Sequence, residues 1–275
     1  MGQVAFNMKS KTLLTIFIIL IGLILFILIN KLLAAFLLVS FLIIYNLSFI
    51  LLLIGGIYYN KDDNHKAGKY FKNAYNLWNS SLQAKMSYAN FLLGQAYIEE
   101  AEKVLKEIIS KKLMKVDEIK AKALFSIILW KTNRLDEAIE MLTLLHEESK
   151  NSLLYQNLGY FLILKGDYSK SLEYNLDAYE YNNTDIGIID NLALNYYFIG
   201  NISKAKELYE TIIPMNPRFA SAYYNYTIAL LSENRVREAL ESLNKALNCK
   251  FSFISIIKKE EIEAKITQIT AMKGF

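Results

Sequence analysis

The chain has few of the residues that build disulfides, metal sites or catalytic clusters. Its 275 residues include one cysteine, Cys249, and two histidines, His65 and His146, which we expect at the surface. One cysteine cannot form a disulfide within the chain, and the set has no Cys/His spacing typical of zinc. No Gly-rich phosphate loop, HExxH motif or triad-like spacing is present. We therefore predict no catalytic residue, no metal, no cofactor and no enzymatic activity.

Acidic residues are absent from the first sixty positions, where Lys9, Lys11 and Lys31 are the only charged side chains. These lysines supply +3 of the net charge of +4, which leaves about +1 for the rest of the chain. So small an excess argues against a nucleic-acid partner. The change in charge indicates that the two parts of the chain meet different environments.

Two uncharged apolar runs fill this acid-free segment. The first would reach about 28 Å as a helix, close to the roughly 30 Å hydrocarbon core of a bilayer, and the second would extend about 10 Å beyond that core. We predict a cytoplasmic tail over 1–11 and a transmembrane helical hairpin over 12–59, with spans at about 12–30 and 33–56. A cleaved signal peptide is the alternative, but a cut after Ala35 would place bulky Leu33 where a small residue is needed.

The lysines that flank the apolar runs predict the orientation. Lys9 and Lys11 precede the first run, and four more lysines follow the second, namely Lys61, Lys66, Lys69 and Lys72. The positive-inside rule then predicts a multi-pass protein of the cell membrane with both termini in the cytoplasm. Asn46 is an amide inside the second run, and we expect it to contact a helix in the membrane, within the hairpin or in an oligomer. Residue usage rich in Lys, Ile and Asn is typical of an AT-rich bacterial genome.

The remainder of the chain contains an internal repeat. Three similar segments start at Tyr155, Ile189 and Tyr223, a constant spacing of 34 residues. Each combines an apolar-periodic helix, a break at Gly or Asn, and a second such helix. Extending the register predicts six helical hairpins, which begin near residues 48, 82, 119, 152, 186 and 220.

Small residues occupy positions 8 and 20 of every predicted hairpin. Position 8 holds Gly55, Ala89, Ser126, Gly159, Ala193 and Thr227, and position 20 holds Ala67, Ala101, Ala138, Ser171, Ala205 and Ala239. A larger side chain would separate closely packed helices, at about 1–3 kcal/mol. The pattern therefore indicates helices in close contact.

This pattern resembles the tetratricopeptide repeat. The matching residues are Leu158, Gly159, Gly166 and Ala178 in the fourth hairpin, and Ala205, Tyr209 and Pro217 in the fifth. Asn175 departs from it, because an apolar residue is expected there. The resemblance implies an all-α fold: a right-handed α-solenoid over 61–253 follows the hairpin, and a capping helix over 254–275 covers its end. Either the membrane helix continues into the first repeat, where Gly55 has the register of position 8, or Gly55 eases helix packing in lipid.

In this family the first helix of each hairpin lines a concave groove that binds peptides or helices of other proteins. Position 6 faces that groove, and here it holds Asn157, Asn191 and Asn225. Their amides suit the backbone of a bound peptide, or they bond locally. The positions beside them, which could equally belong to the core, hold Tyr160, Tyr197, Phe198 and Tyr224.

Anchor and array together predict a membrane-anchored scaffold or adaptor that binds partner proteins or peptides in the groove on the cytoplasmic side. Two alternatives stay open: a peptide-sensing regulator, and an accessory subunit of an envelope or secretion complex that uses Asn46. The expected partners are proteins or peptides and, through two transmembrane helices, the lipid bilayer. Homo-oligomerisation also stays open.

Overall fold

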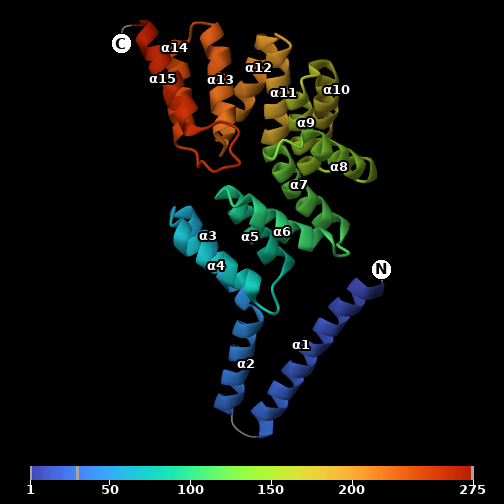
Figure 1. The fold of residues 1–275 in the computed structure, drawn as a ribbon. Helices are drawn as coiled ribbons and strands as arrows, with labels where there is room; N and C mark the ends of the chain where they lie inside the picture. Colours follow the sequence, from blue (N-terminus) through green and yellow to red (C-terminus); the bar gives the residue numbers. More distant parts are fainter. Residues whose placement is uncertain (1, 29–30, 274–275) are drawn as a thin grey trace. The chain divides into compact units, whose positions relative to one another are not determined.

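The computed structural model describes residues 2–28 and 31–273, and its regular secondary structure over these residues is helical (Figure 1). The chain divides into two compact units. The first contains Met1–Leu92 and Glu99–Leu113, and the second contains Leu93–Ile98 and Met114–Phe275.

The first unit begins with two apolar helices, α1 (Gly2–Leu28) and α2 (Lys31–Tyr45), which pack against each other. Two helical hairpins follow: α3 (Leu47–Asn60) with α4 (Asn64–Asn76), and α5 (Leu82–Gly94) with α6 (Ile98–Ile109). Within the described residues, no single helix combines the length and the hydropathy that a membrane crossing requires. The pair α2 and α3 meets both requirements together, but its two helices are bent by 59°.

The break between α2 and α3 corrects the single span predicted over about 33–56. Asn46 lies at the break, and its side-chain amide donates to the Leu42 carbonyl at 2.8 Å. Beyond it, α3 packs along α4 with Ser48 and Gly55 buried. A Cβ atom at Gly55 would lie 2.8 Å from the Phe71 ring, so glycine permits this approach. The second apolar run therefore ends in the first helix of a repeat hairpin.

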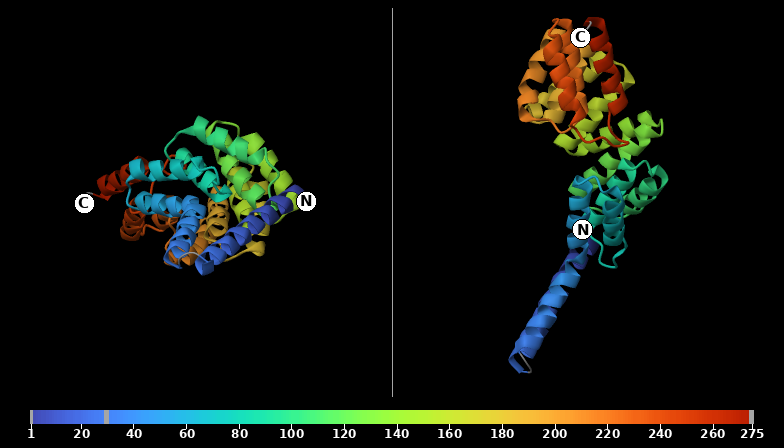
Figure 2. Two further views of the ribbon diagram at one scale, coloured as in Figure 1. Left: turned by 90° about the horizontal axis from the view of Figure 1, so that it is seen from below. Right: turned by 90° about the vertical axis from the view of Figure 1, so that its left-hand side faces the viewer.

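The second unit contains four further hairpins, in which consecutive helices lie side by side (Figure 2). They are α7 (Lys115–Lys131) with α8 (Leu135–Glu148), α9 (Ser152–Lys165) with α10 (Tyr168–Tyr181), α11 (Ile186–Phe198) with α12 (Ile202–Ile212), and α13 (Ala220–Ser232) with α14 (Val236–Leu247). A 3₁₀ turn, η1 (Ile213–Met215), follows α12.

Each hairpin of this unit turns at a residue with left-handed backbone conformation. Asn133, Gly166, Gly200 and Asn234 have φ values of 60°, 90°, 82° and 58°. These are the residue types that adopt such a conformation most readily. In the third of these hairpins, Asn201 then caps α12 by accepting from the Lys204 N–H at 3.2 Å. The left-handed residue thus ends the first helix of a hairpin, and a capping side chain such as that of Asn201 starts the second.

Small residues let the helices of both units pack closely. All twelve small side chains at repeat positions 8 and 20 are buried. Asn175, which departs from the repeat pattern, is also buried, and its amide donates to Asn195 Oδ1 at 3.1 Å. Asn195 in turn donates to the Tyr168 carbonyl at 2.9 Å. A polar network replaces the expected apolar contact at this point.

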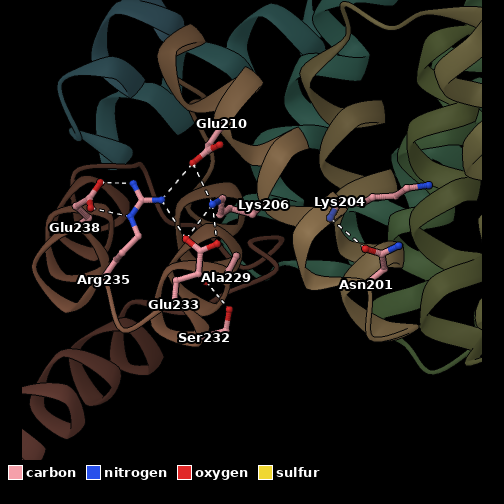
Figure 3. A network of polar contacts seen from close by, with 9 residues as sticks. All are labelled: Asn201, Lys204, Lys206, Glu210, Ala229, Ser232, Glu233, Arg235 and Glu238. Atoms are coloured by element: carbon pink, nitrogen blue, oxygen red, sulfur yellow. Dashed lines mark hydrogen bonds and ion pairs between the residues drawn. The ribbon is translucent and has the colours of Figure 1, made fainter.

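Ion pairs join α12 to the last hairpin (Figure 3). Arg235 contacts Glu238 at 2.6 Å and Glu210 at 3.3 Å, and Lys206 contacts Glu233 at 2.7 Å. The carboxylates hold the pKa of Arg235 above its ordinary value, with Glu238 as the largest cause. This network links three helices across the outside of the array.

The last helix, α15 (Lys259–Lys273), begins five residues later than the capping helix predicted over 254–275. The Lys258 N–H donates to Glu261 at 3.0 Å, which caps the helix start. Ile262 and Ile269 are buried against Leu243 and Ala246 of α14. Residues 250–257 are not helical, and five of them line a cavity, namely Lys250, Ile254, Ser255, Ile256 and Ile257. We call residues 250–257 the strap.

Candidate functional site

The second unit contains a cavity of about 320 Å³ beside the first helices of its hairpins. Residues of α7, α9, α11 and α13 line it, and the strap closes one side. Its walls combine apolar residues with amides and one carboxylate: Ile127, Trp130, Tyr160 and Phe161, then Gln156, Asn157 and Asn191, and Asp190. The volume lies at the low end of the roughly 300–1,000 Å³ typical of ligand pockets. It suits one or two side chains rather than a whole helix.

Three of the predicted groove residues line this cavity, namely Asn157, Asn191 and Tyr160. Tyr160 is tilted edge-on to Trp130, with ring centroids 5.6 Å apart. Burial raises the pKa of Tyr160, so its hydroxyl stays protonated and can donate a hydrogen bond. The structure thus brings together two amides and one aromatic ring from the predicted set.

The amides also hold neighbouring hairpins together. Asn157 donates to the Ala123 carbonyl of α7 at 3.3 Å, and Asn191 donates to the Gln156 carbonyl of α9 at 2.7 Å. Each bond joins the first helices of successive hairpins. The local bonding that we considered as an alternative is therefore present at both positions. A role in holding a peptide backbone stays a prediction for them.

The other four predicted residues lie outside the cavity lining. Phe198 stacks on Tyr168 at 4.7 Å, and Tyr197 packs against the core around Tyr209. Tyr224 packs against the core that α15 covers, and burial raises its pKa. Asn225 interacts with the Asp190 side chain. These side chains support the packing behind the cavity wall.

Asp190 is the functional candidate that repeat-based reasoning missed. Its side chain is 6% exposed and lines the cavity. Burial raises the pKa of this carboxyl to about 7, against the opposing effect of hydrogen-bonding groups on Asn225, Ser221 and Tyr209. The sequence did contain a signal for this residue, because Asp190 is the one charged residue of α11. It occupies the same repeat position as Gln156 in the preceding hairpin.

The strap is fixed to α7 by a lysine between two rings. Lys131 Nζ lies 4.0 Å from the centroid of Trp130 and 5.5 Å from that of Phe253. Burial, with a smaller effect of Lys258, lowers the pKa of Lys131. The Ser252 N–H also donates to Ser255 Oγ at 3.0 Å, which shapes the turn within the strap.

His146 does not lie on the surface as predicted. It is half-buried, with its ring 4.5 Å from that of Tyr155 and 5.3 Å from that of Tyr174. Burial lowers its pKa, which favours the neutral ring. The aromatic packing gives His146 a structural role.

Comparison with known proteins agrees with the repeat architecture. Residues 191–251 match the family model described as "Tetratricopeptide repeat". A tetratricopeptide repeat protein from Parabacteroides merdae ATCC 43184 has a similar structure, with a TM-score of 0.64 and 13% identity over 81% of this chain and 84% of that one. The APC/C hetero-tetramer Cut9-Hcn1 gives a TM-score of 0.60 and 15% identity, over 74% of this chain and 39% of that one. No curated protein matches the sequence.

The family model thus covers the fifth and sixth hairpins, and the two solved structures show that the helical array has the fold of such repeats. Over the described residues, the fold is an all-helical solenoid of helix-turn-helix hairpins.

Proposed function

We propose that the protein is a membrane-tethered scaffold, in which the cavity beside α7, α9, α11 and α13 binds an extended segment of a partner protein on the cytoplasmic side. The cavity carries this proposal. It presents amides, aromatic rings and a carboxylate from helices that the family uses for binding.

The composition of the cavity favours a peptide over a compact folded partner. Gln156 and Asn157 place amide groups beside the apolar walls of Ile127 and Phe161. Their N–H groups donate to Asp185 and to the Ala123 carbonyl, and each side chain also has an oxygen that can accept a hydrogen bond. Such a mixture suits an extended backbone with one or two inserted side chains, because amides pair with backbone groups while the walls exclude water.

Exposed apolar side chains on α1 and α2 support the tether. Many large apolar residues along both helices are more than 40% exposed, as at Phe17, Leu32 and Phe36. So large an exposed apolar surface marks a membrane or protein interaction site. Since α2 has 15 residues, it would reach about 22 Å, so the bilayer would thin around it by several ångströms.

The geometry after the bend supports a place for α3 at the membrane surface. One face of α3 exposes Phe49, Leu53 and Ile57 at intervals of four residues, while the opposite face packs on α4. An apolar stripe of this kind suits a helix that lies in the interface. Trp78 is 84% exposed, and the next residue, Asn79, donates to the Tyr45 carbonyl at 3.2 Å. Aromatic residues near the bend suit the headgroup region.

Site-specific photo-crosslinking tests the groove. A benzophenone amino acid replaces Ile127 in the cavity of the full chain or, as the control, Glu173 on the exposed side of α10. After irradiation in native membranes, the Ile127 probe should capture a defined partner that the Glu173 probe does not. Equal capture from both positions, or none from Ile127, would contradict binding in the groove.

A further inference from the structure

Three buried polar groups, Asp190, Ser221 and Tyr209, lie together at the polar side of the cavity. Within the described residues, Asp190 Oδ1, Ser221 Oγ and Tyr209 OH accept or donate no hydrogen bond of good geometry. All three side chains are more than nine-tenths buried, and Asp190 and Ser221 line the cavity. Buried polar atoms normally have partners, because leaving one unpaired costs about 1–3 kcal/mol. Ser221 and Tyr209 influence the Asp190 carboxyl as neutral neighbours, without good hydrogen-bond geometry, so the cluster contains a buried acid and no cation, and this points to a cationic ligand.

From this cluster we infer that the cavity binds the side chain of a lysine or arginine of the partner, with its cationic group at Asp190. The inference rests on the proposed function, because it names the residue type that the groove recognises. Asp190 is the single carboxylate of the lining and forms no ion pair within the part of the chain that the structure describes. A cation is the ligand that best compensates a buried carboxylate.

The rest of the lining matches such a side chain. Trp130, Phe161 and Ile257 form apolar walls on which the methylene groups of lysine or arginine can lie while the charged end reaches the acid. Ser221 adds an oxygen that accepts a second hydrogen bond from the ammonium or guanidinium group. The cavity therefore offers both features that a long basic side chain requires, namely apolar walls and a carboxylate.

The charged and titratable groups around Asp190 are compatible with this assignment. Tyr160 comes from α9 and Tyr209 from α12, and raised pKa values keep both neutral. Asn225 and Ser221 of α13 are uncharged. Lys250 of the strap also lines the cavity, but its side chain is exposed, whereas Asp190 is buried. The basic group of a partner would thus meet an acid whose hydrogen-bonding neighbours, Asn225, Ser221 and Tyr209, are uncharged.

Peptide pools of defined charge test the inference. The probes are N-acetylated, C-amidated octapeptides with random flanking residues and a central Lys, Arg, Gln or norleucine. The full chain is immobilised in detergent at pH 8, when Asp190 is ionised. We expect about tenfold more retention of the Lys or Arg pool than of the norleucine pool, as for a charge-assisted hydrogen bond. Asp190→Asn should abolish the preference, and the exposed control Glu173→Gln should keep it.

The pH dependence provides a readout that needs no variant. The preference for Lys should weaken at pH 5, when Asp190 is protonated, while norleucine retention stays constant. Equal retention of the Lys and norleucine pools by the wild type would overturn the inference and leave peptide binding intact. Retention of no pool would contradict both the inference and the proposed function. A further outcome is that n-butylammonium chloride binds in a way that depends on Asp190 while the peptide pools are retained equally. That result would contradict the claim that the cation belongs to a partner peptide.

Discussion

At the scale of single residues, the ionised form of Asp190 that would bind a cation is also the form that destabilises the fold. Its carboxyl has a raised pKa, so the folded protein holds this proton more tightly than the unfolded chain does. Stability is therefore highest below the unfolded pKa near 3.8 and falls as the pH rises towards about 7. At about 1.4 kcal/mol for each pKa unit, the difference corresponds to an upper limit of about 4 kcal/mol.

Asp190→Asn should remove most of this pH dependence. The amide cannot ionise, so the variant should exceed the wild type in stability at pH 8 and differ little from it near pH 4. Urea unfolding of the full chain in detergent at several pH values measures the difference. A wild-type–variant difference that is the same at pH 4 and pH 8 would contradict the burial of an ionisable acid at this position.

Gly159 is a second residue on which the site depends. A Cβ atom there would lie 2.3 Å from Asn175 Oδ1 and 3.2 Å from Asn191 Nδ2. Gly159→Ala should destabilise the protein by about 1–3 kcal/mol, because two buried amides would have to move. The matched control is Gly56→Ala in α3, where a Cβ atom meets no atom within 4 Å. Thermal unfolding of both variants checks this, and equal midpoints would contradict the close contact.

At the scale of helices, the sequence predicts the repeat array, including a first hairpin that begins near residue 48, but not the break that separates α3 from α2. Small residues and turn residues recur at fixed spacing, so helix pairs such as α9–α10 follow from the pattern. The boundary between α2 and α3 does not follow from the repeat pattern, because α3 is as apolar as a membrane span. Its apolar residues serve two surfaces, one packed on α4 and one exposed. Hydropathy cannot distinguish these surfaces, and a local Asn46 side-chain bond marks the break.

From the sequence, only those residues of the site can be predicted that occupy fixed positions of the repeat. Asn157 and Asn191 follow from position 6, and both line the cavity. The strap has no periodicity, so its contribution to the cavity wall could be found only from three-dimensional packing. Asp190 stands out as the one charged residue of α11, but its environment depends on residues that are distant in sequence, Tyr209 and Ser221.

The ion-pair network between α12 and the last hairpin yields a prediction at this scale. Arg235→Gln should lower the thermal midpoint at low salt, because Arg235 contacts acids on neighbouring helices as well as Glu238. The loss should shrink in 1 M NaCl, which screens such pairs. Arg237→Gln is the control, since Arg237 pairs with Glu241 on the same helix and its side chain is 93% exposed. Equal effects of the two substitutions would contradict a role of the network in joining helices.

At the scale of the whole molecule, the proposal joins an apolar hairpin to a binding array through the bend at Asn46. Trp78 offers a direct test of this arrangement. Its fluorescence in reconstituted vesicles should be quenched most strongly by lipids brominated near the headgroup, because the proposal places the bend at the interface. Loss of this component in Trp78→Phe, which leaves Trp130 as the other tryptophan, identifies its source. Quenching that is insensitive to Trp78→Phe would contradict the placement.

The central claim is that partners bind the first helices of the last four hairpins. Hydrogen–deuterium exchange of the full chain, alone and with the partner captured at Ile127, tests it most directly. The account predicts slower exchange in α7, α9, α11, α13 and the strap, with α8, α10, α12 and α14 little changed. Protection confined to α8, α10 and α12, or absent from α9 and α11, would contradict it.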